Sequence, residues 1–294
     1  MSIIEEKLAE KRFLVSDGAW GTELARRGLT AAEAPEAWNL ERPDDVLGVA
    51  LAYVEAGSDI ILTNTFGGSR LKLTRAGLAD KVFEINRRGA EISRGAAAGK
   101  ALVFASIGPT GEFMEPFGTV SEDEMIECFA AQAEALAAGG ADGIVIETMT
   151  DLGEARAALT AVKENTDLPV VVCMTFDKGL RGYATMMGVR PAAAAAELEE
   201  AGADAVGSNC GAGIENMIEV AGLMSPATNL PLWIKPNAGL PELVKGRTVF
   251  RETSEQMAGH LPALLEAGAT IIGGCCGTTP EHIRLIVKAR TNLG

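Results

Sequence analysis

The chain has 294 residues, and its 26 lysine and arginine residues stand against 40 aspartate and glutamate residues, giving a formal net charge of −14. Proteins that bind nucleic acid or an anionic membrane surface usually present a positive face, so this balance argues against both kinds of partner. Apolar residues make up 47% of the chain. A chain of about 300 residues buries roughly 75% of its unfolded surface, so a large core is available.

The composition favours a soluble, cytoplasmic protein. The first twelve residues mix acidic and basic side chains where a secretory signal would be apolar, and no apolar run reaches the ~18 residues of a membrane span. The five cysteines are an odd number, which argues against a disulfide framework and in favour of metal binding or catalysis. The chain has two histidines, so few residues are available for acid–base catalysis or metal binding by imidazole.

Strand-like and helix-like segments alternate along the whole chain. Runs that stay apolar until their last residues are typical of parallel strands covered on both faces, and they predict strands at 13–19, 59–65, 102–109, 143–148, 170–176, 205–210, 232–237 and 271–277. Segments rich in alanine, leucine and glutamate predict helices between them, at 43–57, 121–140, 152–164, 191–202, 253–267 and 281–291.

A glycine recurs where four of these helices end, at Gly57, Gly139, Gly202 and Gly268. Glycine adopts the left-handed conformation of a helix C-cap without steric cost. Eight strand–helix units without an intervening linker predict an α/β fold, a (βα)8 TIM barrel that forms a single domain over 1–294. A doubly wound sheet is the alternative, but no G-x-G-x-x-G follows any of the strands.

Active sites of such barrels lie where the strands end and the βα loops begin. The predicted strand ends are rich in carboxylates, amides and thiols and contain no histidine. Their chemically active residues are Asp17, Asn64, Thr65, Glu147, Thr148, Thr175, Asp177, Asn209, Cys210, Asn237, Cys275 and Cys276. His260 and His282 fall on helices, so we interpret them as surface or capping residues.

Three of the cysteines lie at predicted strand ends. Cys210 ends the sixth strand, Cys275 and Cys276 end the eighth, and Asn237 ends the strand between them. At ~4.8 Å per strand the outer two ends are about 10 Å apart, so side chains can converge on one ion. Adjacent side chains of a regular strand point to opposite faces, so the pair can meet only if the neighbouring glycines let the backbone leave extended geometry.

Three thiolates favour a soft or borderline cation, and zinc with one open position is the usual catalytic arrangement. The alternative is that all three are small buried hydrophobic residues, as free cysteine often is. An adjacent pair among glycines, matched by a third thiol, favours the metal. Cys173 and Cys128 have no neighbouring cysteine or glycine cluster of this kind, so we predict that they are small buried residues of the structure.

Six short motifs, at 17–22, 63–66, 107–111, 146–148, 209–210 and 273–280, resemble the homocysteine S-methyltransferase family, especially the homocysteine-binding module of cobalamin-dependent methionine synthases. The resemblance spans nearly the whole chain. It implies a zinc ion held by Cys210, Cys275 and Cys276, with the thiol of homocysteine as the fourth ligand. In the substrate-free form it implies that an oxygen of Asn237 takes that position.

The resemblance also implies how homocysteine binds. Glu147 and Asp17 would bind its amino group, and backbone N–H groups near Gly18 and Ala19 would meet its carboxylate, with Thr65 as a further contact. Two carboxylates that face one cation do make strong charge-assisted contacts. Carboxylates at strand ends can instead cap a helix or pair with an arginine such as Arg190.

The predicted function is a zinc-dependent S-methyltransferase that converts homocysteine to methionine. Zinc deprotonates a bound thiol, and the thiolate is the nucleophile, so no histidine base is needed. The donor predicted first is a methylated corrinoid, because the motifs resemble the methionine synthase module. Since this sequence contains no cobalamin-binding module, that corrinoid would be carried by a separate protein. The alternatives are S-methylmethionine or a betaine as the donor, and a non-catalytic zinc-thiolate module that binds a thiol or a corrinoid partner.

Two loop segments have no assigned chemistry. The segment 20–42 follows the first strand, and the segment 177–189 contains Tyr183, Met186 and Met187. Either segment can form a lid or a donor-binding face, or can pack on the barrel, and we favour packing for the two methionines.

Overall fold

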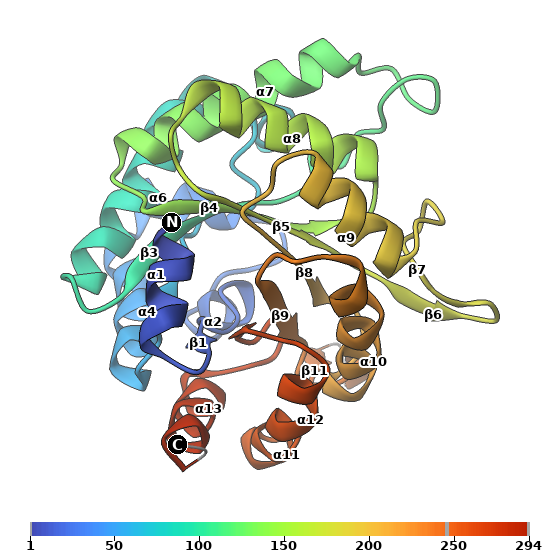
Figure 1. Ribbon diagram of the computed structural model, residues 1–294. Helices are drawn as coiled ribbons and strands as arrows, with labels where there is room; N and C mark the ends of the chain where they lie inside the picture. Colours follow the sequence, from blue (N-terminus) through green and yellow to red (C-terminus); the bar gives the residue numbers. More distant parts are fainter. Residues whose placement is uncertain (1, 245–246, 293–294) are drawn as a thin grey trace.

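The computed structural model describes residues 2–244 and 247–292, whose main sheet is parallel and closes on itself (Figure 1). In these residues the main sheet has eight strands in the order β1-β12-β9-β8-β5-β4-β3-β2. A parallel bridge between Ser16 and Ile60 joins its first strand to its last and completes the ring. The strands are Leu14–Val15 (β1), Ile60–Ile61 (β2), Leu102–Ile107 (β3), Gly143–Met149 (β4), Val170–Met174 (β5), Ala205–Cys210 (β8), Leu232–Pro236 (β9) and Ile271–Ile272 (β12).

Helices encircle the strands on the outside of the ring (Figure 1). The predicted (βα)8 barrel is therefore confirmed. The α-helices are Ile3–Glu10 (α1), Gly21–Arg26 (α2), Trp38–Glu41 (α3), Pro43–Ala56 (α4), Arg70–Thr74 (α5), Val82–Ala97 (α6), Glu122–Ala138 (α7), Leu152–Asn165 (α8), Pro191–Glu200 (α9), Ile214–Met224 (α10), Ser254–Gly259 (α11), Leu261–Glu266 (α12) and Pro280–Asn292 (α13). Short 3-10 helices span Pro35–Ala37 (η1), Ala79–Lys81 (η2) and Ser225–Ala227 (η3).

The strands separate two apolar cores, because successive side chains point to opposite faces of a strand. Leu14, Ile60 and Phe104 belong to the inner core, which also receives Ile4 from α1. Val15 and its equivalents on the other strands belong to the outer core, between the sheet and the helices. Both faces of each strand are therefore buried, which explains the continuously apolar runs in the sequence.

The glycine that recurs before the strands ends the preceding helix. Gly57 (φ 95°), Gly202 (φ 93°) and Gly268 (φ 101°) are left-handed, as predicted. In the second repeat the left-handed residue is Gly140 (φ 85°), whereas Gly139 has a right-handed backbone (φ −79°). The turn that follows each helix is therefore similar in all four repeats.

An aspartate two residues after three of these left-handed glycines ties each new strand to the strand before it. Asp59 accepts the N–H of Val15 at 2.7 Å, Asp142 accepts that of Val103 at 2.9 Å, and Asp204 accepts that of Val170 at 2.8 Å. Each also pairs with a cation: Arg290, Arg94 and Lys163 respectively. The repeat thus satisfies backbone donors at the amino-terminal ends of the strands, where the regular ladder begins.

Some irregular elements depart from the predicted order of helices and strands. The helix predicted at 253–267 is interrupted at His260, because Pro262 has no N–H to continue the helical ladder. Two antiparallel hairpins extend from the loops: Asp177–Gly179 (β6) with Gly182–Ala184 (β7), and Glu242–Val244 (β10) with Arg247–Val249 (β11). Among the described residues, none of the helices has the length and hydropathy that crossing a membrane requires.

We predict that Asp142→Ala lowers the free energy of unfolding by about 1.5–3 kcal/mol, because it leaves the buried end of a strand without a charged acceptor. Urea unfolding followed by circular dichroism measures the change. Asp80→Ala, at an exposed aspartate in η2, is the control and should change the stability by less than about 0.5 kcal/mol. Equal losses in the two variants would contradict a structural role for Asp142.

Candidate metal centre and substrate cavity

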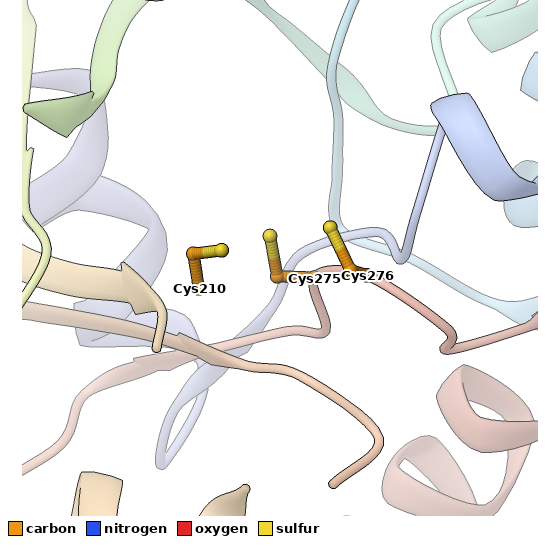
Figure 2. A group of neighbouring side chains, drawn as sticks. All are labelled: Cys210, Cys275 and Cys276. Atoms are coloured by element: carbon orange, nitrogen blue, oxygen red, sulfur yellow. The ribbon is translucent and has the colours of Figure 1, made fainter. Parts of the chain in front are cut away.

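The three cysteines that the sequence singled out lie together at the carboxyl end of the barrel. Cys210 is the last residue of β8, whereas Cys275 and Cys276 follow β12 (Figure 2). Their Sγ atoms all lie within 4.8 Å of one another, and in the described part of the chain no other group of cysteine, histidine or acidic residues forms a comparable candidate site.

The strand between them sets this arrangement. Parallel pairing places Cys210 opposite Pro236 of β9, and the carbonyl oxygen of Pro236 accepts the N–H of Cys275 at 2.7 Å. The chain then turns at Cys276 and Gly277, so the Sγ atoms of the pair both come close to that of Cys210. Gly277 has φ 82°, and a side chain there would clash with the ring of Phe250, so the turn requires glycine.

The donor set fits a metal ion. Asn237 lies beside the thiols: its Nδ2 donates to the carbonyl oxygen of Gly211 at 2.6 Å and is 3.7 Å from Cys210 Sγ. Its Oδ1 is buried and has no hydrogen-bond partner in the described residues. Buried polar atoms rarely stay without a partner, so three thiols and a free amide oxygen indicate a site for a soft or borderline cation.

The thiols already interact with one another. Hydrogen bonds from Cys275 and Cys276 lower the pKa of Cys210 to about 2, and the same interactions raise the pKa of Cys275 and raise that of Cys276 to about 11. A single negative charge is therefore stabilised within the group. Cys128 and Cys173 are buried in the core, where desolvation raises the pKa of each thiol, in agreement with their structural interpretation.

A cavity of about 320 Å³ lies beside the three thiols. Its walls come from residues at or after the carboxyl ends of seven strands, all except β5. They are formed by Gly18, Ala19, Trp20, Gly21, Thr22, Pro35, Glu36, Leu62, Thr63, Asn64, Phe66, Ser106, Glu147, Thr148, Cys210, Lys235, Gly274, Cys275 and Cys276. The volume suits a small amino acid rather than a macromolecular substrate.

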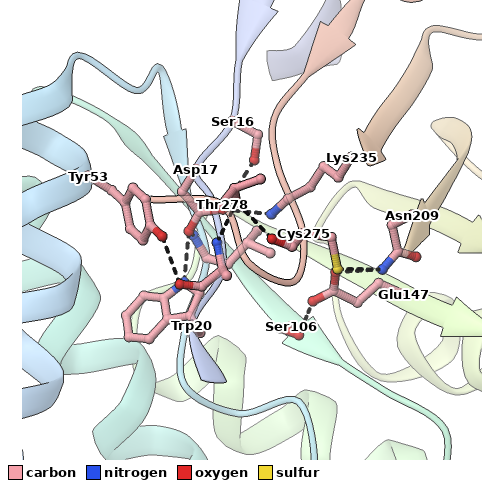
Figure 3. Close-up of polar contacts among 12 residues, drawn as sticks. Ser16, Asp17, Trp20, Tyr53, Ser106, Glu147, Asn209, Lys235, Cys275 and Thr278 are labelled. Carbon is pink, nitrogen blue, oxygen red and sulfur yellow. Dashed lines mark hydrogen bonds and ion pairs between the residues drawn. The ribbon is translucent and has the colours of Figure 1, made fainter. Parts of the chain in front are cut away.

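Glu147 lies near the carboxyl end of β4 and lines the cavity (Figure 3). Its Oε1 accepts the hydroxyl of Ser106 at 2.6 Å, and its Oε2 lies 3.3 Å from Asn209 Nδ2. Burial raises the pKa of this carboxyl group, against the opposing effects of Lys235 and Ser106. A ligand cation would therefore find a poorly solvated carboxylate at this point.

Asp17 lies behind the cavity wall. Its Oδ1 forms an ion pair with Lys235 Nζ at 2.7 Å, and its Oδ2 accepts from Trp20 Nε1 at 2.8 Å and from the N–H of Leu62 at 2.7 Å (Figure 3). Asp17 is 0% exposed and Lys235 2% exposed. Both oxygens of Asp17 thus have protein partners.

The structure brings some of the predicted substrate-binding residues to the cavity and not others. Glu147, Gly18 and Ala19 line it, whereas Asp17 and Thr65 do not. The hydroxyl of Thr65 donates to the carbonyl oxygen of Ser106 at 2.7 Å, and Thr63 lines the wall in its place. Contact of Asp17 or Thr65 with a substrate therefore stays a prediction.

Several wall residues were missed from the sequence. Lys235 gave a signal, because it is the lone charge in an apolar strand. Glu36 is 5% exposed and accepts the N–H of Gly67 at 2.6 Å. No pattern in the sequence around it indicates that it lines a cavity. Trp20 and Glu36 show that the segment 20–42 forms part of the wall.

The other predictions about loops and histidines had mixed outcomes. The packing interpretation of the two methionines in the segment 177–189 is wrong, because Met186 is 66% exposed and Met187 37% exposed beside the β6–β7 hairpin.

His282 is a buried capping residue whose Nδ1 lies 3.2 Å from the backbone nitrogen of Thr279, next to the start of α13. His260 lies at the surface.

Comparisons with known proteins agree with the predicted family. A family model described as homocysteine S-methyltransferase matches residues 14–290. The methionine synthases of Mycobacterium leprae and Mycobacterium tuberculosis are each 32% identical to the chain, over 97% and 96% of its length. The chain spans 25% of the length of each of these relatives.

A solved structure agrees as well. The homocysteine methyltransferase MmuM from Escherichia coli, in its metallated form, has 25% sequence identity and a TM-score of 0.81, over 96% of this chain and 98% of that one. The predicted S-methyltransferase class is thus confirmed at the level of the family. The chain belongs to the homocysteine S-methyltransferase family.

Proposed function

We propose that the chain transfers a methyl group to the thiol of homocysteine, giving methionine, at a zinc ion held by Cys210, Cys275 and Cys276. One observation carries the proposal: three thiols lie within 4.8 Å of one another in the wall of a small cavity that Glu147 also lines. Thiols supply the metal ligands, and the carboxylate supplies a contact for an amino acid. Membership of the family supports homocysteine as the substrate.

A free thiol has a pKa near 8.5 and is mostly protonated at neutral pH, whereas the thiolate is the nucleophile. When bound, zinc would hold the substrate sulfur as a thiolate. Cys210, Cys275 and Cys276 would be three of its ligands, and Asn237 Oδ1 would be the fourth in the absence of substrate. The unpartnered state of that oxygen supports this role. Because the thiolate forms without a neighbouring base, the absence of histidine from the cavity wall is no obstacle.

The remaining wall residues would orient the amino acid. Glu147 would accept the ammonium group, and the backbone around Gly18 and Ala19 would face the carboxylate. Asp17, which directly precedes Gly18 and forms an ion pair with Lys235, would hold that backbone in position. In the reaction the sulfur donates an electron pair to form the new S–CH₃ bond. The bond from the methyl group to its donor breaks, and the electron pair leaves with the donor.

For the donor we propose a methylated corrinoid carried outside these 294 residues. The methionine synthases match the chain over only 25% of their length, so the barrel corresponds to one part of a larger assembly in those proteins. Large apolar side chains are exposed on three loops at the carboxyl end of the barrel, where the cavity lies, and a carrier protein that docks there would bury them. They are Phe113, Phe117, Leu180, Met186, Leu240 and Leu243.

A small methyl donor, such as S-methylmethionine or a betaine, is the second candidate. The match with the E. coli homocysteine methyltransferase covers 98% of that protein's chain. That chain therefore consists almost entirely of the matched barrel. The cavity of about 320 Å³ has room for homocysteine and part of a small donor.

We predict that Cys276→Ala lowers the affinity for zinc by more than about 100-fold, because a lost ligand should exceed the roughly 10–100-fold effect of a lost outer contact. Zinc content after dialysis against a graded chelator, measured by plasma emission spectroscopy, gives the result. Cys128→Ala removes a buried thiol on α7, away from the site, and should retain the metal. Full zinc retention by Cys276→Ala would refute the three-cysteine site.

We predict that Glu147→Gln weakens homocysteine binding to the zinc-loaded protein by about 10–100-fold, the effect of losing a hydrogen bond to a charged group. Burial raises the pKa of Glu147. The wild-type advantage over Glu147→Gln should therefore be complete above this raised pKa and disappear as the pH falls through it and the carboxylate is protonated. Isothermal titration calorimetry at a series of pH values measures both effects.

The matched control for this experiment is Glu154→Gln. Glu154 is also a buried carboxyl group whose pKa burial raises, but it accepts from Thr110 and does not line the cavity. Its substitution should leave homocysteine affinity and its pH dependence close to those of the wild type. A Glu147→Gln protein that binds homocysteine normally at every pH would contradict the assigned contact.

We predict methionine formation when zinc-loaded protein and homocysteine are mixed with a methylated corrinoid protein. Parallel reactions with S-methylmethionine and betaine test the second candidate, and turnover with one of these alone would select it. Absence of turnover with every donor, while zinc and homocysteine still bind, would sink the methyltransferase proposal and favour a non-catalytic thiol-binding module.

A further inference from the structure

The side chain of Asn209 contacts two other parts of the barrel, β4 and the segment that follows β12. Asn209 precedes Cys210 on β8 and is 0% exposed. Its Nδ2 donates to Thr148 Oγ1 at 2.7 Å and lies 3.3 Å from Glu147 Oε2 and 3.7 Å from Cys275 Sγ. One amide group therefore bridges the carboxylate of β4 and a thiol that follows β12 (Figure 3).

Two of the residues beside Asn209 have unusual backbones. Thr148 has φ 63° and Cys210 has φ 65°, and a positive φ is rare for any residue with a side chain and rarest for a β-branched one. Asn209 holds Thr148 through both atoms of its amide, because Oδ1 also accepts the N–H of Thr148 at 2.7 Å. Such conformations persist only where the surroundings enforce them. The amide thus fixes the backbone that directly follows Glu147.

The hydrogens of the amide are fewer than the acceptors around them. Nδ2 carries two hydrogens, whereas Thr148 Oγ1, Glu147 Oε2 and Cys275 Sγ all lie within reach. Because Thr148 Oγ1 is the nearest acceptor, it takes one hydrogen. The second hydrogen is then shared by the carboxylate and the sulfur as a bifurcated hydrogen bond. A hydrogen bond to a sulfur or carboxylate ligand of a metal site tunes its charge and its orientation. The two ends of the substrate site therefore share one donor.

We propose that Asn209 is a positioning residue that couples Glu147 to the thiol centre, so that the site selects thiols that also carry an α-ammonium group. The inference rests on the proposed function, because it takes Glu147 as the acceptor of the ammonium group. Binding of an ammonium group to Glu147 orders the carboxylate that shares the amide hydrogen with Cys275. The thiol and ammonium ends of the substrate are then recognised together, although they contact different strands.

The test compares two thiols, homocysteine and 4-mercaptobutanoate, which differ only in the amino group. Their dissociation constants for the zinc-loaded protein are measured by isothermal titration calorimetry, and their ratio reports the selection for ammonium. We expect the wild type to favour homocysteine by about tenfold or more, as for one hydrogen bond to a charged group. Glu147→Gln should bring the ratio close to one. Asn209→Leu, once loaded with as much zinc as the wild type, should lower it at least about fivefold towards that value.

A second substitution covers the case in which leucine prevents folding. Asn209→Ser has a side chain too short to keep all of the amide's contacts and should lower the ratio in the same way. The matched control is Asn86→Leu: Asn86 is also 0% exposed and donates to the carbonyl oxygens of Gly68 and Val82. It should lose thermal stability and keep the wild-type ratio.

The results separate this inference from the proposed function. Asn209 variants that weaken both thiols equally, or that keep the wild-type ratio, would overturn the coupling role while methionine formation by the wild type still stands. A ratio lowered as far by Asn86→Leu would overturn it too, since general loosening would then explain the effect. A wild-type protein that binds both thiols equally and forms no methionine would contradict the proposed function itself.

Discussion

Parallel pairing of β8, β9 and β12 is the constraint on which the candidate site depends. Pro236 of β9 contributes to both pairings. It lies opposite Cys210 in the register of β8 and β9, and its carbonyl oxygen accepts the N–H of Cys275. Two segments that are 65 residues apart in the chain are thereby held on either side of one strand. The thiols meet because backbone hydrogen bonds position them, so the group can form before any ion binds. The turn at Gly277 then adds the third thiol.

The two ends of the barrel use buried charge differently. At the amino-terminal ends of the strands, Asp59, Asp142 and Asp204 accept strand N–H groups and pair with surface cations, which serves stability. At the carboxyl ends, Asp17 and Lys235 form a pair that is almost fully buried. A buried ion pair seldom adds net stability, since desolvation costs about as much as the attraction returns. Its place beneath the cavity is better explained by the positioning of the wall than by folding.

Sequence patterns predicted the regular parts of the fold because burial and helix formation act over many residues. Eight apolar runs and the Ala/Leu/Glu-rich segments gave the order of the barrel, and the recurring glycine gave the helix ends. Local exceptions escaped prediction. Pro262 divided a helix, and the β6–β7 hairpin left Met186 and Met187 exposed, although methionine usually packs in cores. Such features depend on single residues and on which neighbours are within reach.

The sequence alone determined the chemistry available at the barrel mouth: three thiols, several amides and two candidate carboxylates at strand ends, in a pattern that resembles one family. Only the tertiary structure decided how these groups divide between the cavity and its supporting layer. Glu147 reaches the cavity, whereas Asp17 is held behind the wall by Lys235, Trp20 and Leu62. The physical reason is that strands lose their regular alternation where they end. There, as at Thr148 and Cys210 with their positive φ angles, contacts from other strands set the direction of each side chain.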